Sequence, residues 1–413
     1  MKKAIPAGIL SFLLIFTFCA CSLFEPEHGF WRGGEDNPGT IVCEEAELAP
    51  ESLQRLNIPE DASICCGEEE SVLYLTGERA NETQFSGTVL HRYDRSTGES
   101  TPVADLPGLI YRYKSEKSAC VIGQNLYIIS QEPEIRENSI LRVDLLSGET
   151  EVLYRWQGIC GQAEISSAAA GSRLILFHMD RLSEKEWNYI AEVIDPEDGE
   201  AVTLADMHGS GDDGSSILSA AAKDQDIALC VCEHEDGKKR IFIDSFRADG
   251  QRIKREQVIG PELSGKEDSG EENLPDVTDF GYAAGYYILD LFYHEKNEKT
   301  SGRIRLSRES DDGPATAAEL VEAEGEMFSY IPVPGGREDA VICFGDRKER
   351  GNIIFLFDAE QQKCRRVQLP EGHDDCVHGF IGTAEGSLIL LDTDPWSGLQ
   401  GTSYLIPKEE LSV

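Results

Sequence analysis

Two short stretches of the sequence carry side chains that could bind a metal ion. The first holds His373, Asp374, Asp375, Cys376 and His378. Imidazole, carboxylate and thiolate groups of this kind can bind a transition metal. The second stretch holds His208, Asp212 and Asp213, and its carboxylate oxygens are ligands suited to calcium. Neither stretch has a known ligand spacing, and the alternative is a pair of solvated turns that use Gly and Asp for backbone geometry. We therefore expect no metal and no cofactor.

Three tryptophans could bind a ligand by stacking. Trp156, Trp187 and Trp396 lie close to polar loops, where an exposed aromatic ring suits a sugar or a peptide. The alternative is that each ring packs against its own loop, since single exposed hydrophobic residues are common. The sequence has no GxSxG or HExxH motif and no phosphate-binding glycine loop, and its carboxylates are too numerous to nominate an acid/base pair. Catalytic residues are therefore not assigned.

The N-terminus has the layout of a secretory signal peptide. Lys2 and Lys3 precede a short apolar run, which is too short to span a bilayer comfortably because a membrane helix needs about 20 apolar residues. The segment Phe18-Cys19-Ala20-Cys21 resembles a bacterial lipobox, with Phe18 where that family has Leu or Val. The resemblance implies cleavage before Cys21 and lipid modification of its side chain; a plain secreted protein or an uncleaved anchor is the alternative. We expect residues 1–20 to be the signal peptide, residues 21–39 a flexible tether, and the protein to be held on the extracytoplasmic side of the cell membrane.

The net charge of the chain is strongly negative, at −38. A negative electrostatic potential of this size repels nucleic acid, so we expect no nucleic-acid partner. The acidic residues are spread along the chain, which is also what solubility alone would require. Twelve cysteines show no paired CxxC zinc spacing, and several lie inside apolar runs, where a thiol is most often a small buried hydrophobic group.

A turn motif repeats along the chain at intervals of about fifty residues. Asp94 and Gly98, Asp144 and Gly148, and Asp195 and Gly199 form three copies at offsets of 50 and 51, and degenerate copies follow. A second glycine comes ten residues after each of these glycines. Self-similarity at this period indicates a repeat architecture. We expect these Asp and Gly residues to have structural roles in turns.

Each repeat holds short apolar runs bounded by Gly, Asp and Ser, which predict strands. About four strands per repeat of this length describe the blade of a β-propeller. Segments such as LHRYDRSTGES and ILRVDLLSGET resemble the repeats of TolB-like and quinoprotein-like bacterial propellers, and that resemblance covers about residues 40–413 without fixing a subfamily. We predict an all-β, seven-bladed propeller of four-stranded antiparallel blades, with six or eight blades as the alternative.

The last repeat ends after its third strand, and an orphan strand-like segment, Thr40 to Leu48, precedes the first. We expect that N-terminal segment to complete the last blade and close the ring, which would protect exposed edges. The Asp-x-x-x-Gly turns would then share one face with the tight connections, and the irregular loops would share the other. Binding usually resides on variable loops of a rigid scaffold. We expect a binding or scaffolding module for a protein, peptide or glycan; the alternative is a hydrolase or lyase that acts on glycans through carboxylates at the channel mouth.

Overall fold

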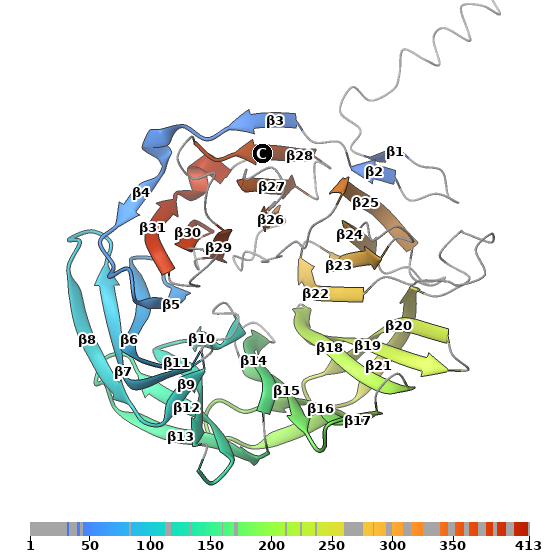
Figure 1. Ribbon diagram of the computed structural model, residues 1–413, viewed down its shortest axis with the longest axis horizontal. Coiled ribbons are helices and arrows are strands. Elements are labelled where there is room, and N and C mark those ends of the chain that lie inside the picture. Colours follow the sequence, from blue (N-terminus) through green and yellow to red (C-terminus); the bar gives the residue numbers. More distant parts are fainter. Residues whose placement is uncertain are drawn as a thin grey trace, which may run out of the picture.

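The computed structural model is nearly all β, and the strands follow one another in antiparallel succession (Figure 1). It describes residues 31–32, 39–41, 44–81, 84–111, 117–132, 134–158, 160–168, 172–210, 213–223, 225–235, 238–259, 276–283, 285–294, 300–308, 315–324, 339–345, 352–358, 363–370, 377–382, 386–393 and 400–411. The short 3-10 helices η1 (Pro50–Ser52) and η4 (Lys408–Leu411) accompany the strands.

Two large sheets hold the first half of the chain. The nine-stranded sheet consists of β5 (Ser63–Gly67), β6 (Ser71–Asn81), β7 (Gln84–Asp94), β8 (Ser100–Leu106), β9 (Leu109–Tyr111), β10 (Ala119–Ile122), β11 (Asn125–Glu132), β12 (Glu137–Asp144) and β13 (Thr150–Gln157). The eight-stranded sheet consists of β14 (Cys160–Ala168), β15 (Arg173–Arg181), β16 (Glu186–Ile194), β17 (Ala201–Ser210), β18 (Asp213–Lys223), β19 (Asp226–Glu235), β20 (Lys238–Arg247) and β21 (Arg252–Ile259).

Three smaller sheets hold the rest, and each includes strands from the N-terminal segment. The six-stranded sheet consists of β22 (Asp276–Ala283), β23 (Tyr286–His294), β24 (Thr300–Arg308) and β25 (Ala315–Glu324) with β1 (Trp31–Arg32) and β2 (Gly39–Ile41). One four-stranded sheet consists of β26 (Asp339–Gly345), β27 (Asn352–Asp358), β28 (Lys363–Gln368) and β3 (Glu44–Glu47). The other consists of β29 (Val377–Gly382), β30 (Leu388–Thr393), β31 (Gln400–Ile406) and β4 (Gln54–Leu56).

The strand sequences explain which strands lie inside. The run Leu126–Ser130 of β11 is apolar apart from its last residue and buried throughout, as a strand covered on both faces should be. The neighbouring β12 consists of buried and partly buried positions, and β13 is buried only at Trp156. Figure 1 accordingly shows β5, β10, β14, β18 and β22 around the central space and β8, β13 and β21 on the outer rim.

Within the sheets, the antiparallel runs β5–β8, β10–β13, β14–β17 and β18–β21, and the runs β22–β25, β26–β28 and β29–β31 that follow, are called units here. Hydrophobic core lies between successive units. One cluster joins Tyr127 and Ile140 of one unit to Ile165 and Leu176 of the next. Another joins residues near the end of the chain, such as Ile389, to residues near its beginning, such as Ile64. Burial of a large aliphatic or aromatic side chain contributes roughly 1.5–3 kcal/mol, so these interfaces hold neighbouring units together.

The Asp-x-x-x-Gly motif joins the third strand of a unit to the fourth. Asp94 ends β7, and its Oδ1 accepts hydrogen bonds from the backbone N–H groups of Ser96 and Thr97 at 2.8 and 2.9 Å. These hydrogen bonds, with that of the Ser96 hydroxyl first, lower the pKa of Asp94. Gly98 has a φ of 72°, in the left-handed region that favours glycine.

The same glycine in later repeats also makes the contact to the preceding unit. A Cβ on Gly148 would lie 2.3 Å from the carbonyl oxygen of Val103, and a Cβ on Gly199 would lie 2.3 Å from that of Leu153. Both oxygens belong to the outer strand of the preceding unit. The repeated glycine therefore permits the turn of one unit to rest on the backbone of its neighbour.

The N-terminal segment joins three sheets in succession, which corrects the predicted role of Thr40 to Leu48. Within this segment, Thr40 pairs with Glu319 of β25 in parallel register, and Glu44–Glu47 pair in parallel with β28. None of these described residues pairs with β31. The strand that pairs with β31 is Gln54–Leu56, further along the chain, in antiparallel register. The expected strand is displaced because η1, at Pro50–Ser52, turns the chain into the next sheet.

Candidate functional site

The irregular connections lie at the end of the sheets opposite the Asp-x-x-x-Gly turns, because the strands are antiparallel. The register places Trp156 opposite Asn138 near the β11–β12 connection. It places Trp187 opposite Arg181 at the β15–β16 connection. The two tryptophans therefore lie at the same end of their sheets, which we call the loop face.

An arginine–tryptophan pair with exposed hydrophobic neighbours lies on the loop face. The Arg181 guanidinium is 5.7 Å from the centre of the half-buried Trp187 ring, within the range of a cation–π contact. Leu182, next to Arg181, is 56% exposed. Ile135, in the corresponding connection of the preceding unit, is 59% exposed. Apolar and aromatic side chains beside a cation are the chemistry of a binding surface.

Trp156 belongs to the core, contrary to the expected exposed ring. It is 8% exposed and packs with Ile129 and Ile140 of its own unit and with Ala163 of the next. Its ring centre lies 5.1 Å from that of His178. Trp156 therefore joins two units and offers no exposed stacking surface.

A row of titratable side chains, formed by Tyr154, Glu192, His178 and Asp180, lies beside the contact between Trp156 and His178. His178 Nδ1 lies 3.1 Å from Asp180 Oδ2, and His178 Nε2 lies 3.9 Å from Glu192 Oε2. The Tyr154 hydroxyl donates to Glu192 Oε2 at 2.8 Å. Burial, and then the hydrogen bond to Glu192, raise the pKa of Tyr154, which stays a donor at neutral pH. The row connects β13 to β15 and β16.

This row also contains unsatisfied polar atoms. In the part of the chain that the structure describes, Trp156 Nε1 and Asp180 Oδ1 are buried and have no hydrogen-bond partner. Such atoms are usually served by internal water, because leaving them unpaired costs about 1–3 kcal/mol each. Gly158 borders the site, since a Cβ there would lie 2.9 Å from the Asp180 carboxyl carbon.

A second polar cluster lies at the innermost strands. Lys117 Nζ is 3.6 Å from Glu164 Oε2 and 3.3 Å from Ser219 Oγ, and that hydroxyl is 3.3 Å from the same Glu164 oxygen. The three residues come from three successive four-strand units, with Glu164 on β14 and Ser219 on β18. Glu164 is 5% exposed, so its carboxylate is buried while it contacts the lysine ammonium and accepts the hydrogen bond of the serine hydroxyl.

The metal candidates fall mainly outside the described residues. Residues 371–376, which include His373, Asp374 and Asp375, are not described, nor are Asp212 and Trp396. His208 is exposed on β17 and pairs in register with Asn188. His378 lies on β29 opposite Asp392. Within the described ranges, no group of three or more His, Cys, Asp or Glu side chains could hold a metal ion.

The cysteines that the structure describes with side chains are free thiols. Cys230 and Cys232 are buried, as their apolar context predicts. Cys65 and Cys66 form no disulfide with each other in the structure, and an irregularity in register interrupts the pairing of β5 with β6 between Ile64 and Cys66. Burial raises the pKa of Cys120 to about 12, so its thiol is protonated at neutral pH.

Sequence reasoning missed the row formed by His178, Asp180 and Glu192, although a signal existed. The strand RLILFHMDR places His178 and Asp180 two residues apart, hence on one face of β15, at the end of an otherwise apolar run. Glu192 sits on the neighbouring strand, opposite Leu176 on the same face. Polar residues on a predicted core face, at the end of a strand, indicate a buried polar contact.

No protein-family model matches the chain, and no curated protein matches it. Several solved structures are similar to it. An oligogalacturonate lyase in complex with manganese is 12% identical, with 87% of this chain and 94% of that chain covered and a TM-score of 0.53. An ulvan lyase bound to -[GlcA(1-4)Rha3S]- is 9% identical, with 85% and 94% covered and a TM-score of 0.53. The hydrazine synthase of Kuenenia stuttgartiensis is 12% identical, with 84% and 96% covered and a TM-score of 0.51.

At these identities the similarity shows the fold alone. The two lyases are β-propeller proteins, and this chain shares their fold. A propeller places variable connections on rigid blades, but the fold does not specify what they bind. In the part of the chain that is described, no helix is long and apolar enough to cross a membrane.

Proposed function

We propose that this β-propeller is a binding or scaffolding module for a protein, peptide or glycan, with its contacts on the loop face. The Arg181–Trp187 pair, flanked by the exposed Leu182, carries the proposal. Tryptophan and arginine are the residue types that most often dominate binding energy at interfaces. Across the molecule, the opposite face is occupied by the repeated tight turns.

The experiment compares two exposed leucines on opposite faces. Leu182→Asp places a charge on the loop face, and Leu146→Asp places the same charge in an Asp-x-x-x-Gly turn, where Leu146 is 72% exposed. Solubilised membranes of the native cell are cross-linked to each tagged variant, and the captured proteins and glycans are compared with those of the wild type. Loss of a specific captured species with Leu182→Asp alone supports the proposal. An identical set with both variants would exclude the loop face.

We further propose a ring of seven blades. Four units of four strands, β5–β8, β10–β13, β14–β17 and β18–β21, are followed by β22–β25 and by two three-stranded units that β3 and β4 complete. The pairing of β4 with β31 supports closure between the two ends of the chain. Deletion of residues 54–56 should then abolish the cooperative unfolding transition in calorimetry, whereas a deletion that melts like the wild type would contradict closure.

Lipid anchoring through Cys21 on the extracytoplasmic side of the cell membrane is the proposed location. The short apolar run and the lipobox-like segment support it. Cells fed a clickable fatty acid should label the wild type and the Cys43→Ala control, and Cys21→Ala should lose the label. Equal labelling of Cys21→Ala would refute the anchor.

A glycan lyase or hydrolase is the second candidate, favoured by the carboxylate of Glu164 on an innermost strand. The similar lyases are named for oligogalacturonate and for ulvan, so these two glycans are the first substrates to assay. Elimination produces an unsaturated sugar that absorbs ultraviolet light. Turnover by the wild type that disappears in Glu164→Gln would support catalysis. If the wild type does not degrade oligogalacturonates or ulvan, a lyase or hydrolase activity on these two glycans is excluded.

A further inference from the structure

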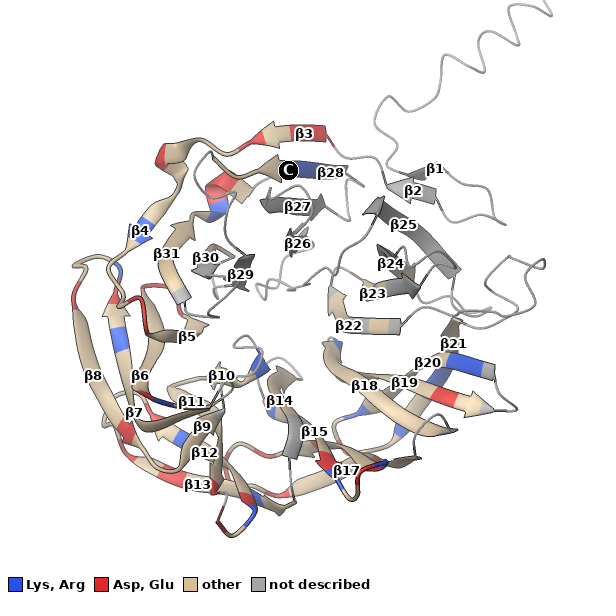
Figure 2. Ribbon diagram, viewed as in Figure 1, with Lys and Arg blue, Asp and Glu red and all other residues tan. Residues whose placement is uncertain are grey.

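Two adjacent cysteines lie on the innermost strand of the first unit. Strand β5 has the sequence SICCG and contains Cys65 and Cys66, and both thiols are free. Figure 1 shows β5 and β10, the first strand of the next unit, beside the central space, and the two strands are in contact. Neither strand contains a charged residue, so both are tan in Figure 2. The two thiols are therefore set in an apolar part of the sheet.

An extra residue in β5 turns both cysteines to the same side. In a regular strand, consecutive side chains point to opposite faces. The register pairs Ile64 with Tyr74 and Cys66 with Leu73, so Cys65 is inserted between two paired positions. Accordingly, Ile64 belongs to one core cluster, whereas Cys65 and Cys66 both pack in another. The irregularity brings together two thiols that a regular strand would separate.

The two thiols are hydrogen-bonded to each other. Cys65 Sγ donates to the carbonyl oxygen of Leu73 at 3.3 Å. The hydrogen bond with Cys65 is the main cause that raises the pKa of Cys66, and the charge of Glu68 adds to it. A hydrogen bond that raises the pKa of a thiol favours its protonated form, so the Cys66 S–H group donates to Cys65. The sulfur atoms therefore lie within reach of each other.

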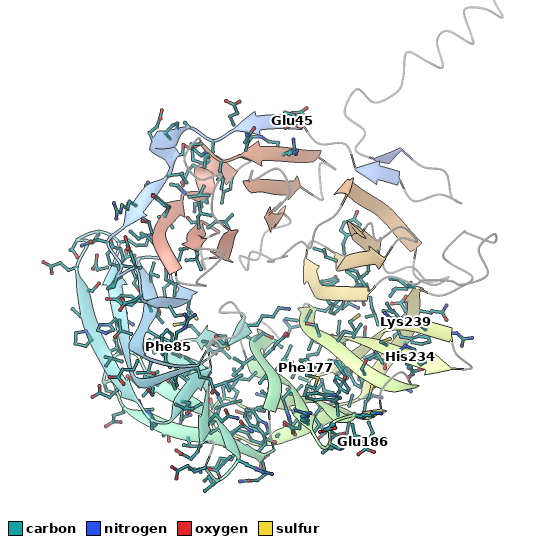
Figure 3. The ribbon with its side chains drawn as sticks, in the orientation of Figure 1. Glu45, Phe85, Phe177, Glu186, His234 and Lys239 are labelled. Carbon is teal, nitrogen blue, oxygen red and sulfur yellow. The ribbon has the colours of Figure 1, made fainter. Side chains whose placement is uncertain are left out.

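The third thiol near this place faces away from the pair. On β10, Ala119 and Val121 pack with the core cluster that contains Cys65. Cys120, between them, packs against the cluster on the other face of β10, as the alternation of side chains along a strand requires. Figure 3 shows the side chains packed between these strands and labels Phe85, on β7 of the same sheet. Cys120 is a partly exposed thiol of the adjacent unit and serves as a matched control.

The two adjacent thiols differ in their access to solvent. Cys65 is 3% exposed, whereas Cys66 is partly exposed. A reagent from solution therefore meets Cys66 first. Cys65 is then already held beside it, in the position that a second reacting thiol needs.

We propose that Cys65 and Cys66 form a reversible two-electron redox site that is oxidised by a disulfide compound, RSSR. Cys66 loses its proton and its thiolate attacks RSSR, which forms a mixed disulfide and releases RS⁻, and RS⁻ takes up that proton. Cys65 then loses its proton, its thiolate attacks the Cys66 sulfur, and a second RSH leaves. The protein loses two hydrogen atoms as the bond between the cysteines forms, and RSSR is reduced to two RSH.

The site is separate from the loop face. Cys66 lies next to the β5–β6 turn, and the strands are antiparallel, so this turn is at the opposite end of the sheet from the β6–β7 connection on the loop face. The inference therefore goes beyond the proposed binding function.

A disulfide between adjacent residues should be strained and readily reduced. Adjacent Cα atoms are about 3.8 Å apart, whereas the Cα atoms of a disulfide are usually about 4.4–6.8 Å apart. Strained disulfides have the higher reduction potentials that are typical of labile and regulatory bonds. A domain outside the cytoplasm, the location proposed above, meets disulfide oxidants. The pair is therefore a reversible site and not a permanent cross-link.

The test measures the oxidation state of the full-length protein in detergent. A protonated thiol exchanges slowly, so the protein is brought to equilibrium with cystamine and cysteamine, a small cationic couple that Glu68 does not repel. After alkylation with iodoacetamide, tryptic peptide 56–79 reports Cys65 and Cys66 alone, and peptide 118–136 reports Cys120 alone. In the wild type, peptide 56–79 should lose two hydrogen atoms and resist alkylation. The equilibrium constant for this oxidation should be about tenfold or more higher in the native protein than in urea, because the fold holds the thiols together.

Single variants test the order of the two steps. Cys65→Ser removes the second thiol and should retain a cysteamine adduct on Cys66, whereas Cys66→Ser should leave the buried Cys65 unmodified. Cys120→Ser should oxidise at peptide 56–79 as the wild type does. No oxidation of the wild type at this peptide, a disulfide that joins peptides 56–79 and 118–136, equal adducts on the first two variants, or equal equilibrium constants in buffer and urea would overturn the proposal. Melting curves check that the variants are folded, and the comparison of buffer with urea uses the wild type alone.

Discussion

Alanine in place of Gly148 should cost more stability than alanine in place of Gly98, although both glycines occupy the same place in the turn motif. Their φ values, 75° and 72°, are almost equal, so the backbone cost of a Cβ is the same at both sites. That cost is about 1–2 kcal/mol for an L-residue in the left-handed region. The two sites differ in what the new Cβ meets.

At Gly98 the nearest atom to an added Cβ is the Tyr93 hydroxyl oxygen at 3.8 Å, an ordinary contact. At Gly148 it is the Val103 carbonyl oxygen at 2.3 Å, and a backbone atom cannot rotate away. Relief requires the turn to move off the outer strand of the preceding unit. Overpacking of this kind typically costs about 1–3 kcal/mol. We therefore expect a loss of about 1–2 kcal/mol for Gly98→Ala and about 2–5 kcal/mol for Gly148→Ala.

Urea unfolding followed by circular dichroism measures the free energy of unfolding of each variant. The dependence of this free energy on urea concentration must be the same for all variants, so that a shift of the midpoint reports a change in stability. Gly199→Ala serves as a replicate, because its Cβ would meet the Leu153 carbonyl oxygen at the same 2.3 Å. Equal losses at Gly98 and Gly148 would show that the motif serves the local turn alone. The reasoning about contact between units would then be refuted.

Three further outcomes are expected. Leu56→Ala, in the strand paired with β31, should cost about 2–5 kcal/mol in urea unfolding because Leu56 is 5% exposed, whereas Leu146→Ala, at 72% exposed, should change stability by less than about 0.5 kcal/mol. Asp94→Asn should be less stable than the wild type at neutral pH; because the folded pKa of Asp94 is lowered, its contribution is present above the usual pKa of 3.8 and the difference should shrink as the pH falls below it. Cys120 should react with iodoacetamide much more slowly in the native protein than after unfolding, in a mass-spectrometric time course, because burial raises its pKa to about 12 and the thiolate is the reactive form.

The repeat could be predicted because it depends on local chemistry. Asp94 accepts from two backbone N–H groups two and three residues ahead, and Gly98 adopts a positive φ, so both constraints lie within a few residues of sequence. Strand positions followed for the same reason, since buried runs such as Leu126–Ser130 are apolar. What these patterns leave open is which unit contacts which, as in the approach of Gly148 to Val103.

The candidate site was harder to predict because its contacts join different units. Trp156 lies beside polar residues in the sequence, which suggested exposure, but the adjacent unit covers it with His178 and Ala163. The partner of Glu164 is Lys117, from another unit, and Ser219 comes from a third. Sequence periodicity describes one strand at a time, so it identifies the face of a residue without identifying what packs against that face.

The strands with which the N-terminal segment pairs could have been predicted better from charge. Thr40 to Leu48 was assigned to the last unit by counting strands, and the structure divides it between β25 and β28. Strand propensity is similar at any open edge, so counting alone could not select the partner. Charge could have done so, since Glu44–Glu47 is acidic and β28 is the basic outer strand beside it.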